Sequence, residues 1–299
     1  MIKKLADTRE YDAAIERVVL LLKAYPENAQ SQGKRSEQQD AFGFWTESED
    51  QACDQILAVI CDGMGGLSLG EQASQLAVES FIGSFSAKDR AMTSESLIDA
   101  AFAANEAVLE MSYNSGCGGR TGTTLAAVAY KDGVCNWVSV GDSHTYIYRK
   151  GRIELLNRDH NLASNLESLV ISGRLTREEA DSYGQREALT SFIGIEELKE
   201  IDFSPEPIRL EHGDCILLCT DGLYKTLSDR VMESIIKKAG RVDDHGNIAE
   251  KLVSAALEQD HPQQDNLTVL VLKFQENSII KRMLGFLSLS NEGEERMEK

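Results

Sequence analysis

Short apolar runs recur along the chain with the length and composition of buried strands. They are about 5–8 residues long and are bounded by Gly, Asp or short polar turns. The runs lie at 56–61 (ILAVIC), 124–130 (TLAAVAY), 134–140 (VCNWVSV), 145–149 (TYIYR), 215–219 (CILLC) and 267–274 (LTVLVLKF). The turns KDG at 131–133 and RKG at 149–151 join neighbouring runs so closely that these strands are expected to form antiparallel hairpins.

Longer segments with apolar residues at helical spacing lie between these runs. The clearest helical segments are 70–85, 94–112, 176–183, 228–239 and 247–259. The strands cluster in the middle of the chain, and pairs of helices precede and follow them. This order differs from the strict alternation of a parallel sheet and predicts an α+β layered fold with antiparallel sheets.

The two ends of the chain differ from its middle. Residues 3–24 have the spacing of a helix that Pro26 ends, and the polar PENAQSQGK after it is typical of a turn. Apolar positions within 279–287 indicate a short helix before the acidic tail NEGEERMEK. We therefore expect a helical extension at 1–27, the main domain at 28–275, and a helix with an acidic tail at 276–299. Each end either packs on the main domain or docks a partner, and weak contact with a membrane is a further alternative for the C-terminal helix.

The composition of the chain indicates its cellular compartment and the kinds of partner that it disfavours. The chain is 42% hydrophobic and 27% charged, with a net charge of −18. This acidity disfavours binding to nucleic acid or to an anionic membrane surface. No apolar run approaches the roughly 18 residues that a spanning helix needs. The six cysteines show neither a CxxC pair nor zinc-like spacing, so we expect a reduced, cytoplasmic protein, most simply a monomer.

Four aspartates stand at the ends of predicted strands. Asp62 follows ILAVIC, Asp142 follows VCNWVSVG, Asp221 follows CILLCT, and Asp265 lies just before LTVLVLKF. A carboxylate beside a buried strand is costly unless it is paired, hydrogen-bonded or bound to a metal. One Asp-Gly pair at such a place is usually a simple turn. Four of these aspartates, on separate strands, indicate a shared site instead.

The donor types indicate which metals such a site would bind. Oxygen ligands without supporting Cys or His favour Mg²⁺ or Mn²⁺ over zinc or copper. Two such ions can ionise a water near neutral pH and hold a phosphoryl group. In DGMGG at 62–66, the glycines would let the backbone approach an ion, and a main-chain carbonyl can itself be a ligand.

Six segments occur in the order found in the metal-dependent protein phosphatases, also called the protein phosphatase 2C family. They are DGMGG, RTGTTLAAVAY, SVGDSHTYIYRKGRIELLNRDHNL, LTSFIG, LLCTDGLYKTLSD and QQDNLTVLVLKF. The chain resembles this family, in its bacterial type, from about Arg35 to Phe274. The resemblance implies a four-layer α-β-β-α sandwich of two antiparallel sheets flanked by helix pairs, with residues 28–275 as the catalytic domain. It also implies a phosphatase for phosphoserine and phosphothreonine in proteins, opposing a Ser/Thr kinase.

The resemblance implies roles for single residues of a binuclear Mn²⁺ or Mg²⁺ centre. Asp62 would bridge the two ions, and the carbonyl of Gly63 would bind the second. Asp221 and Asp265 would hold the first. Asp142 matches an aspartate that helps to bind a weaker third ion in many bacterial members.

Two further residues of GKRSEQQDAFGF take roles from the family. Arg35 would pair with the substrate phosphate, for which a guanidinium has a suitable bidentate geometry. Asp40 would lie near the metal-bound waters. The implied reaction is an in-line attack of activated water on the phosphomonoester, without a covalent phospho-enzyme.

The chain departs from the family pattern at three positions. Gln39 stands where many members have Glu, and its neutral amide oxygen would be a weaker ligand for the second ion. Met64 stands where some members have a His that protonates the leaving group, so the general acid stays unassigned. His144 replaces a frequent Arg, and no role is attached to it.

Two other readings stay open. Residues 161–187 correspond to the family's flap, which would shape substrate access, but their composition also fits an ordinary exposed helix; His160 before them is more often a structural histidine than a catalyst. For the whole chain, the alternatives are a catalytically silent module, supported only by Gln39, and a metallohydrolase for small phosphoesters or nucleotides.

Overall fold

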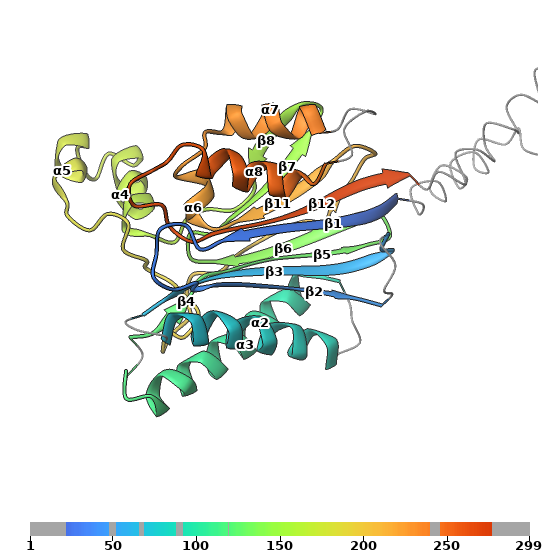
Figure 1. Ribbon diagram of the computed structural model, residues 1–299. Coiled ribbons are helices and arrows are strands. Elements are labelled where there is room, and N and C mark those ends of the chain that lie inside the picture. Colours follow the sequence, from blue (N-terminus) through green and yellow to red (C-terminus); the bar gives the residue numbers. More distant parts are fainter. Residues whose placement is uncertain are drawn as a thin grey trace, which may run out of the picture.

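The chain forms a sandwich of two antiparallel sheets with helices on both outer faces (Figure 1). This arrangement is seen in a computed structural model that describes residues 22–47, 52–65, 69–87, 92–118, 120–239 and 246–276. It confirms the predicted fold class of two antiparallel sheets flanked by helix pairs. Among the described residues, no helix combines the length and apolar composition needed to cross a membrane.

The first sheet has the order β1-β12-β11-β7-β8, and the second is built on the order β10-β6-β5-β3-β2. The strands of the first are β1 (Leu22–Ser31), β12 (Leu267–Glu276), β11 (Cys215–Cys219), β7 (His144–Arg149) and β8 (Arg152–Leu155). Those of the second are β10 (Ile208–Arg209), β6 (Val134–Val140), β5 (Leu125–Lys131), β3 (Gln55–Met64) and β2 (Asp40–Thr46). The short strands β4 (Gly122–Thr123) and β9 (Asp202–Phe203) pair with β3 and β6.

Helices cover the outer face of each sheet. Helices α2 (Leu69–Ala87) and α3 (Ser94–Asn114) pack on the second sheet, and α7 (Asp229–Ala239) and α8 (Ile248–Leu257) pack on the first. The short helix α6 (Asp221–Tyr224) follows β11 directly. Helices α4 (Leu162–Ile171) and α5 (Arg177–Ser182) stand at one end of the sandwich (Figure 1).

The central strands are apolar throughout because both of their faces are buried. In β3, Leu57 and Val59 pack towards the helices of the outer layer, while Ile56 and Ile60 pack between the two sheets. Leu270 of β12 belongs to the same layer between the sheets. This double burial explains why continuous apolar runs, rather than alternating ones, mark these strands in the sequence.

The N-terminal part of the chain differs from its prediction. Residues 22–24 are not the end of a helix, and the segment that looked like a turn is strand β1, which pairs with β12 along its whole length, from Leu22↔Glu276 to Ser31↔Leu267. Pro26 is tolerated because β1 lies at the edge of its sheet. No strand lies on its other side, so the N–H that proline lacks is not needed for a hydrogen bond to a second neighbour. The sheet thus includes residues 22–27, which the prediction placed in the extension.

The remaining predictions for the ends lie outside the described residues. These are the helix over residues 3–21 and, after Gln275 and Glu276 of β12, the helix and acidic tail over 277–299.

Candidate metal centre

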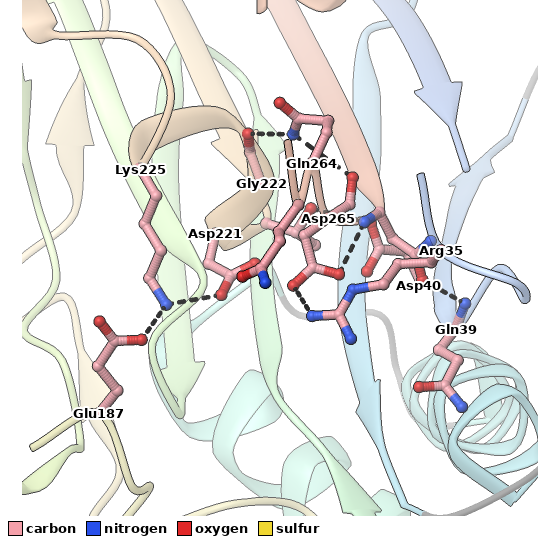
Figure 2. Close-up of polar contacts among 12 residues, drawn as sticks. Arg35, Gln39, Asp40, Glu187, Asp221, Gly222, Lys225, Gln264 and Asp265 are labelled. Atoms are coloured by element: carbon pink, nitrogen blue, oxygen red, sulfur yellow. Dashed lines mark hydrogen bonds and ion pairs between the residues drawn. The ribbon is translucent and has the colours of Figure 1, made fainter. Parts of the chain in front are cut away.

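Carboxylates from four separate segments meet at one end of the sandwich. Asp40 begins β2 and lies directly opposite Asp62 of β3 in the antiparallel register. Asp221 follows the end of β11, and Asp265 precedes β12. Figure 2 shows Asp40, Asp221 and Asp265 facing a common region together with Arg35. The sheets therefore bring together side chains that lie far apart in the sequence.

A pocket of about 480 Å³ opens at this place. It is lined by Arg35, Ser36, Glu37, Gln39, Asp62, Gly63, Met64, Gly65, Asp221, Asp265 and Asn266. Five of the seven residues predicted from the sequence as site residues are among these. The other two, Asp40 and Asp142, are buried beside the pocket and do not line it.

Asp40 is held from behind by two hydroxyl groups. Its Oδ2 accepts hydrogen bonds from Thr220 Oγ1 at 2.9 Å and from Thr268 Oγ1 at 2.7 Å. Its Oδ1 is buried without a hydrogen-bond partner in the structure. Burial, opposed by these two hydroxyls and supported by the charges of Asp221 and Asp265, raises the pKa of Asp40 to about 7.

The pKa values of the neighbouring carboxyl groups are also raised. Burial raises the pKa of Asp62 well above its ordinary value, and the charge of Asp40 adds to this effect. The pKa of Asp142 is raised to about 6, mainly by burial and to a smaller extent by the charge of Asp221. Like charges at close range disfavour the ionised forms, and a bound cation would reverse this effect. The cluster therefore has the electrostatics of a cation site.

The oxygen atoms that lack partners fit a metal site. Besides Asp40 Oδ1, Asp221 Oδ1 is buried with no hydrogen-bond partner, which is unusual unless a ligand satisfies it. All donors here are oxygen atoms, as Mg²⁺ and Mn²⁺ prefer. Within the described part of the chain, however, no three acidic, histidine or cysteine side chains lie close enough to hold one ion. An ion here would complete its coordination with a main-chain carbonyl and water.

Two glycines allow the close backbone contacts around the carboxylates. A Cβ on Gly63 would lie 2.1 Å from the Gly70 carbonyl oxygen and 2.6 Å from that of Gln39. A Cβ on Gly222 would lie 2.0 Å from the carbonyl oxygen of Asn266. The second contact presses α6, which carries Asp221, against the segment that carries Asp265.

The Asn266 side chain holds the loop that carries Arg35 in place through hydrogen bonds. Its Oδ1 accepts from the Gln39 N–H at 2.8 Å, and its Nδ2 donates to the carbonyls of Gln32 and Glu37, each at 2.9 Å. Arg35 then reaches Asp265, with Nη2 and Oδ2 2.5 Å apart (Figure 2). Its side chain is 59% exposed, so the rest of the guanidinium faces solvent at the pocket.

The sequence reasoning missed Lys225 and Asn266. Lys225 Nζ donates to Asp221 Oδ2 at 2.8 Å and to Glu187 Oε2 at 2.9 Å. Its spacing of four residues from Asp221 was a usable clue, because residues at i and i+4 meet on a helical turn. Asn266 directly follows Asp265, but no local sequence pattern predicts its contacts with the loop at 32–39.

His144 and His160 both have structural partners. The ring of His144 stacks on Tyr224 with centroids 3.6 Å apart, and its Nε2 and Nδ1 lie 2.8 Å from Asp159 Oδ1 and 2.7 Å from Tyr146 Oη. His160 Nδ1 accepts from the Gly141 N–H at 3.2 Å, in keeping with the structural reading of this residue.

Comparison with known proteins agrees with this arrangement. The family model for protein phosphatase 2C matches residues 29–258. The serine/threonine protein phosphatase PstP of Mycobacterium tuberculosis is 32% identical over 224 residues, covering 72% of this chain and 40% of PstP. The chain thus spans about two fifths of the length of that curated relative.

Solved structures share the fold. A serine/threonine phosphatase of S. agalactiae superposes with a TM-score of 0.69 at 28% identity, covering 84% of this chain and 99% of that one. The catalytic domain of PstP in complex with two manganese ions gives a TM-score of 0.67 at 25% identity, covering 85% and 100%. Because the family model covers most of the sandwich and the solved relatives share its fold, this chain belongs to the protein phosphatase 2C family.

Proposed function

We propose that this chain is a metal-dependent phosphatase that hydrolyses phosphoserine and phosphothreonine in proteins. The observation that carries the proposal is the meeting of Asp62, Asp221 and Asp265 with Arg35 around one pocket. The two manganese ions in the related PstP domain support Mn²⁺ or Mg²⁺ as the cofactor.

Each residue has a distinct part in this proposal. Asp62 lines the pocket and would bridge two ions, with Gly63 supplying a carbonyl oxygen to the second. Asp221 and Asp265 would hold the first ion, and Asp40 would accept hydrogen bonds from water near it. When bound, the ions supply a water of lowered pKa and stabilise negative charge on the phosphoryl group.

Arg35 would bind the phosphate while it stays paired with Asp265. A guanidinium has five N–H donors, so one can hold the carboxylate while others meet phosphate oxygens. Met64 lines the pocket but has no proton to donate, and water would supply the leaving-group proton instead. The reaction would need no nucleophilic side chain and form no covalent intermediate.

The partners follow from the same proposal. The substrates would be phosphorylated proteins made by a Ser/Thr kinase, in a cytoplasmic signalling setting, with the phosphatase acting as a monomer. The open pocket suits a phosphorylated side chain that projects from a protein surface.

The test is hydrolysis of a phosphothreonine peptide by the purified chain. We expect turnover with Mn²⁺, none in EDTA, and recovery when Mn²⁺ is restored. Asp221→Asn removes a ligand charge and should reduce kcat more than about 100-fold, with an unchanged circular dichroism spectrum. Hydrolysis that continues in chelator would refute the metal mechanism. Preference for small phosphoesters over the peptide would favour a different substrate class, and no Mn²⁺ binding would favour a silent module.

A further inference from the structure

Lys225 places a positive charge within the carboxylate cluster. It directly follows α6 and lies one turn after Asp221, and Figure 2 shows its side chain running between Asp221 and Glu187. Its Nζ donates to Asp221 Oδ2 at 2.8 Å and to Glu187 Oε2 at 2.9 Å. The Lys225 side chain is 40% exposed and that of Asp221 is 17% exposed, so the contact is partly shielded from water.

The two oxygens of Asp221 have different environments. Oδ2 accepts the bond from Lys225, whereas Oδ1 is buried and has no hydrogen-bond partner. Asp221 lines the pocket, and Oδ1 is its oxygen that no protein donor occupies. Asp221 can therefore keep its contact with Lys225 while it serves as a metal ligand through the other oxygen.

Asp142, the residue expected to help bind a third ion, lies at the same end of the sheet as Asp221. His144 of β7 pairs with Cys219 of β11 in the antiparallel register, so Asp142, two residues before His144, and Asp221, two residues after Cys219, both lie where this strand pair ends. Asp142 is buried outside the pocket, and the Asp221 charge disfavours its ionised form, whereas the Lys225 charge favours it. A single ammonium group thus compensates both carboxylates. It also repels a further divalent ion that approaches Asp221 from the side of Oδ2, because an ammonium and a divalent ion at close range strongly disfavour each other.

We infer that Lys225 is a built-in cation that replaces a third metal ion between Asp142 and Asp221, with Glu187 holding its ammonium group in place. This inference rests on the proposed function, since it presupposes a two-ion centre at Asp62, Asp221 and Asp265. It assigns the chain a fixed capacity of two divalent ions. It also assigns Glu187, at the end of the 161–187 segment, an ionic contact with the metal centre through Lys225.

The test is the number of Mn²⁺ ions bound, measured by equilibrium dialysis with metal analysis and by calorimetric titration. We expect two ions in the unmodified chain and a third ion in Lys225→Gln, which removes the charge and frees Asp221 Oδ2. Lys225→Met serves as a second variant if the glutamine amide itself occupies the site. Adding Asp142→Asn to Lys225→Gln should return the count to two.

The matched control is Lys150→Gln. Lys150 lies in the turn between β7 and β8, pairs with Glu211, and its side chain is 76% exposed. The substitution therefore removes the same charge at a place away from the metal centre. It should leave the count at two. A count of three in the unmodified chain, or of two in both Lys225 variants, would overturn the inference while the phosphatase proposal stood. A count of zero in the unmodified chain would overturn both.

Discussion

The pairing of Asp40 with Asp62 across β2 and β3 sets the electrostatics of the site at the residue level. Two carboxyl groups in one cross-strand pair are destabilising unless something compensates them. Hydroxyls of Thr220 and Thr268 compensate one oxygen of Asp40, and its other oxygen has no protein partner. The stability of this end of the molecule should therefore depend on both pH and divalent ions.

In EDTA, the chain should become less stable as the pH rises from 5.5 to 7.5. Burial raises the pKa of Asp40 from 3.8 to about 7, so between these values the folded chain keeps a proton that the unfolded chain has released. The free energy of unfolding then falls by about 2 kcal/mol for this group between pH 5.5 and 7.5. Thermal unfolding at the two pH values measures the effect.

Mn²⁺ should remove most of this loss at pH 7.5, because it binds the ionised carboxylates. Asp40→Asn should reduce the pH dependence in EDTA without abolishing it, because the pKa values of Asp62 and Asp142 are raised as well. A melting temperature that rises between pH 5.5 and 7.5 in EDTA would contradict the prediction.

Arg35→Ala should lower kcat/KM for a phosphothreonine peptide by about 10- to 100-fold, because it removes a charge-assisted bond to the phosphate. Arg35→Lys should recover only part of this, since an ammonium lacks the bidentate geometry. Arg152→Ala, an exposed residue at the start of β8, is the control and should leave kcat/KM unchanged. Equal kcat/KM values for Arg35→Ala and the unmodified chain would exclude a role for this residue in substrate binding.

At the level of elements, the site depends on how tightly the end of β3 packs against its neighbours. The Gly63 N–H donates to the Gln39 carbonyl at 3.0 Å, while the start of α2 lies against the Cα of Gly63. This contact leaves no room for a side chain. Small changes in backbone position there would move the carbonyl that is proposed to bind an ion.

Gly63→Ala should weaken Mn²⁺ binding by at least about 10-fold and lower the melting temperature, because its Cβ would overlap two backbone oxygens. Gly83→Ala in the middle of α2 is the matched control, since nothing lies within 4 Å of its added Cβ. That substitution should stabilise the chain by about 0.5–1 kcal/mol through higher helix propensity. Calorimetric titration and thermal unfolding distinguish the two; equal Mn²⁺ affinity in both variants would contradict the role of Gly63.

For the whole molecule, the apolar layer between the sheets supports the metal centre without taking part in it. Leu270 of β12 is fully buried in this layer and does not line the pocket. Leu270→Ala should lower the free energy of unfolding by about 2–5 kcal/mol. Leu257→Ala, 41% exposed at the end of α8, should cost less than about 1 kcal/mol.

Urea unfolding measures both leucine variants. Each folded variant should still bind the same number of Mn²⁺ ions as the unmodified chain. A changed ion count in Leu270→Ala would mean that the sheet packing sets the site geometry directly.

Most of the sandwich could be predicted from the sequence because its central strands carry a local pattern. The runs at 134–140 and 215–219 coincide with β6 and β11. Edge elements were harder to recognise. β1 is half-exposed and contains Pro26, and its pairing with β12 joins residues about 240 positions apart, so no local pattern marks it as a strand.

The metal centre likewise has some features that local sequence patterns predict and others that they do not. The sequence by itself determined the family and placed Asp62, Asp221 and Asp265 at strand ends, because apolar runs and Asp-Gly turns are local features. Only the tertiary structure decided that Asp40 lies opposite Asp62, that Asp142 lies outside the pocket, and that Lys225 pairs with Asp221 and Glu187. These contacts depend on register, sheet order and side-chain direction, which arise only when distant segments pack together.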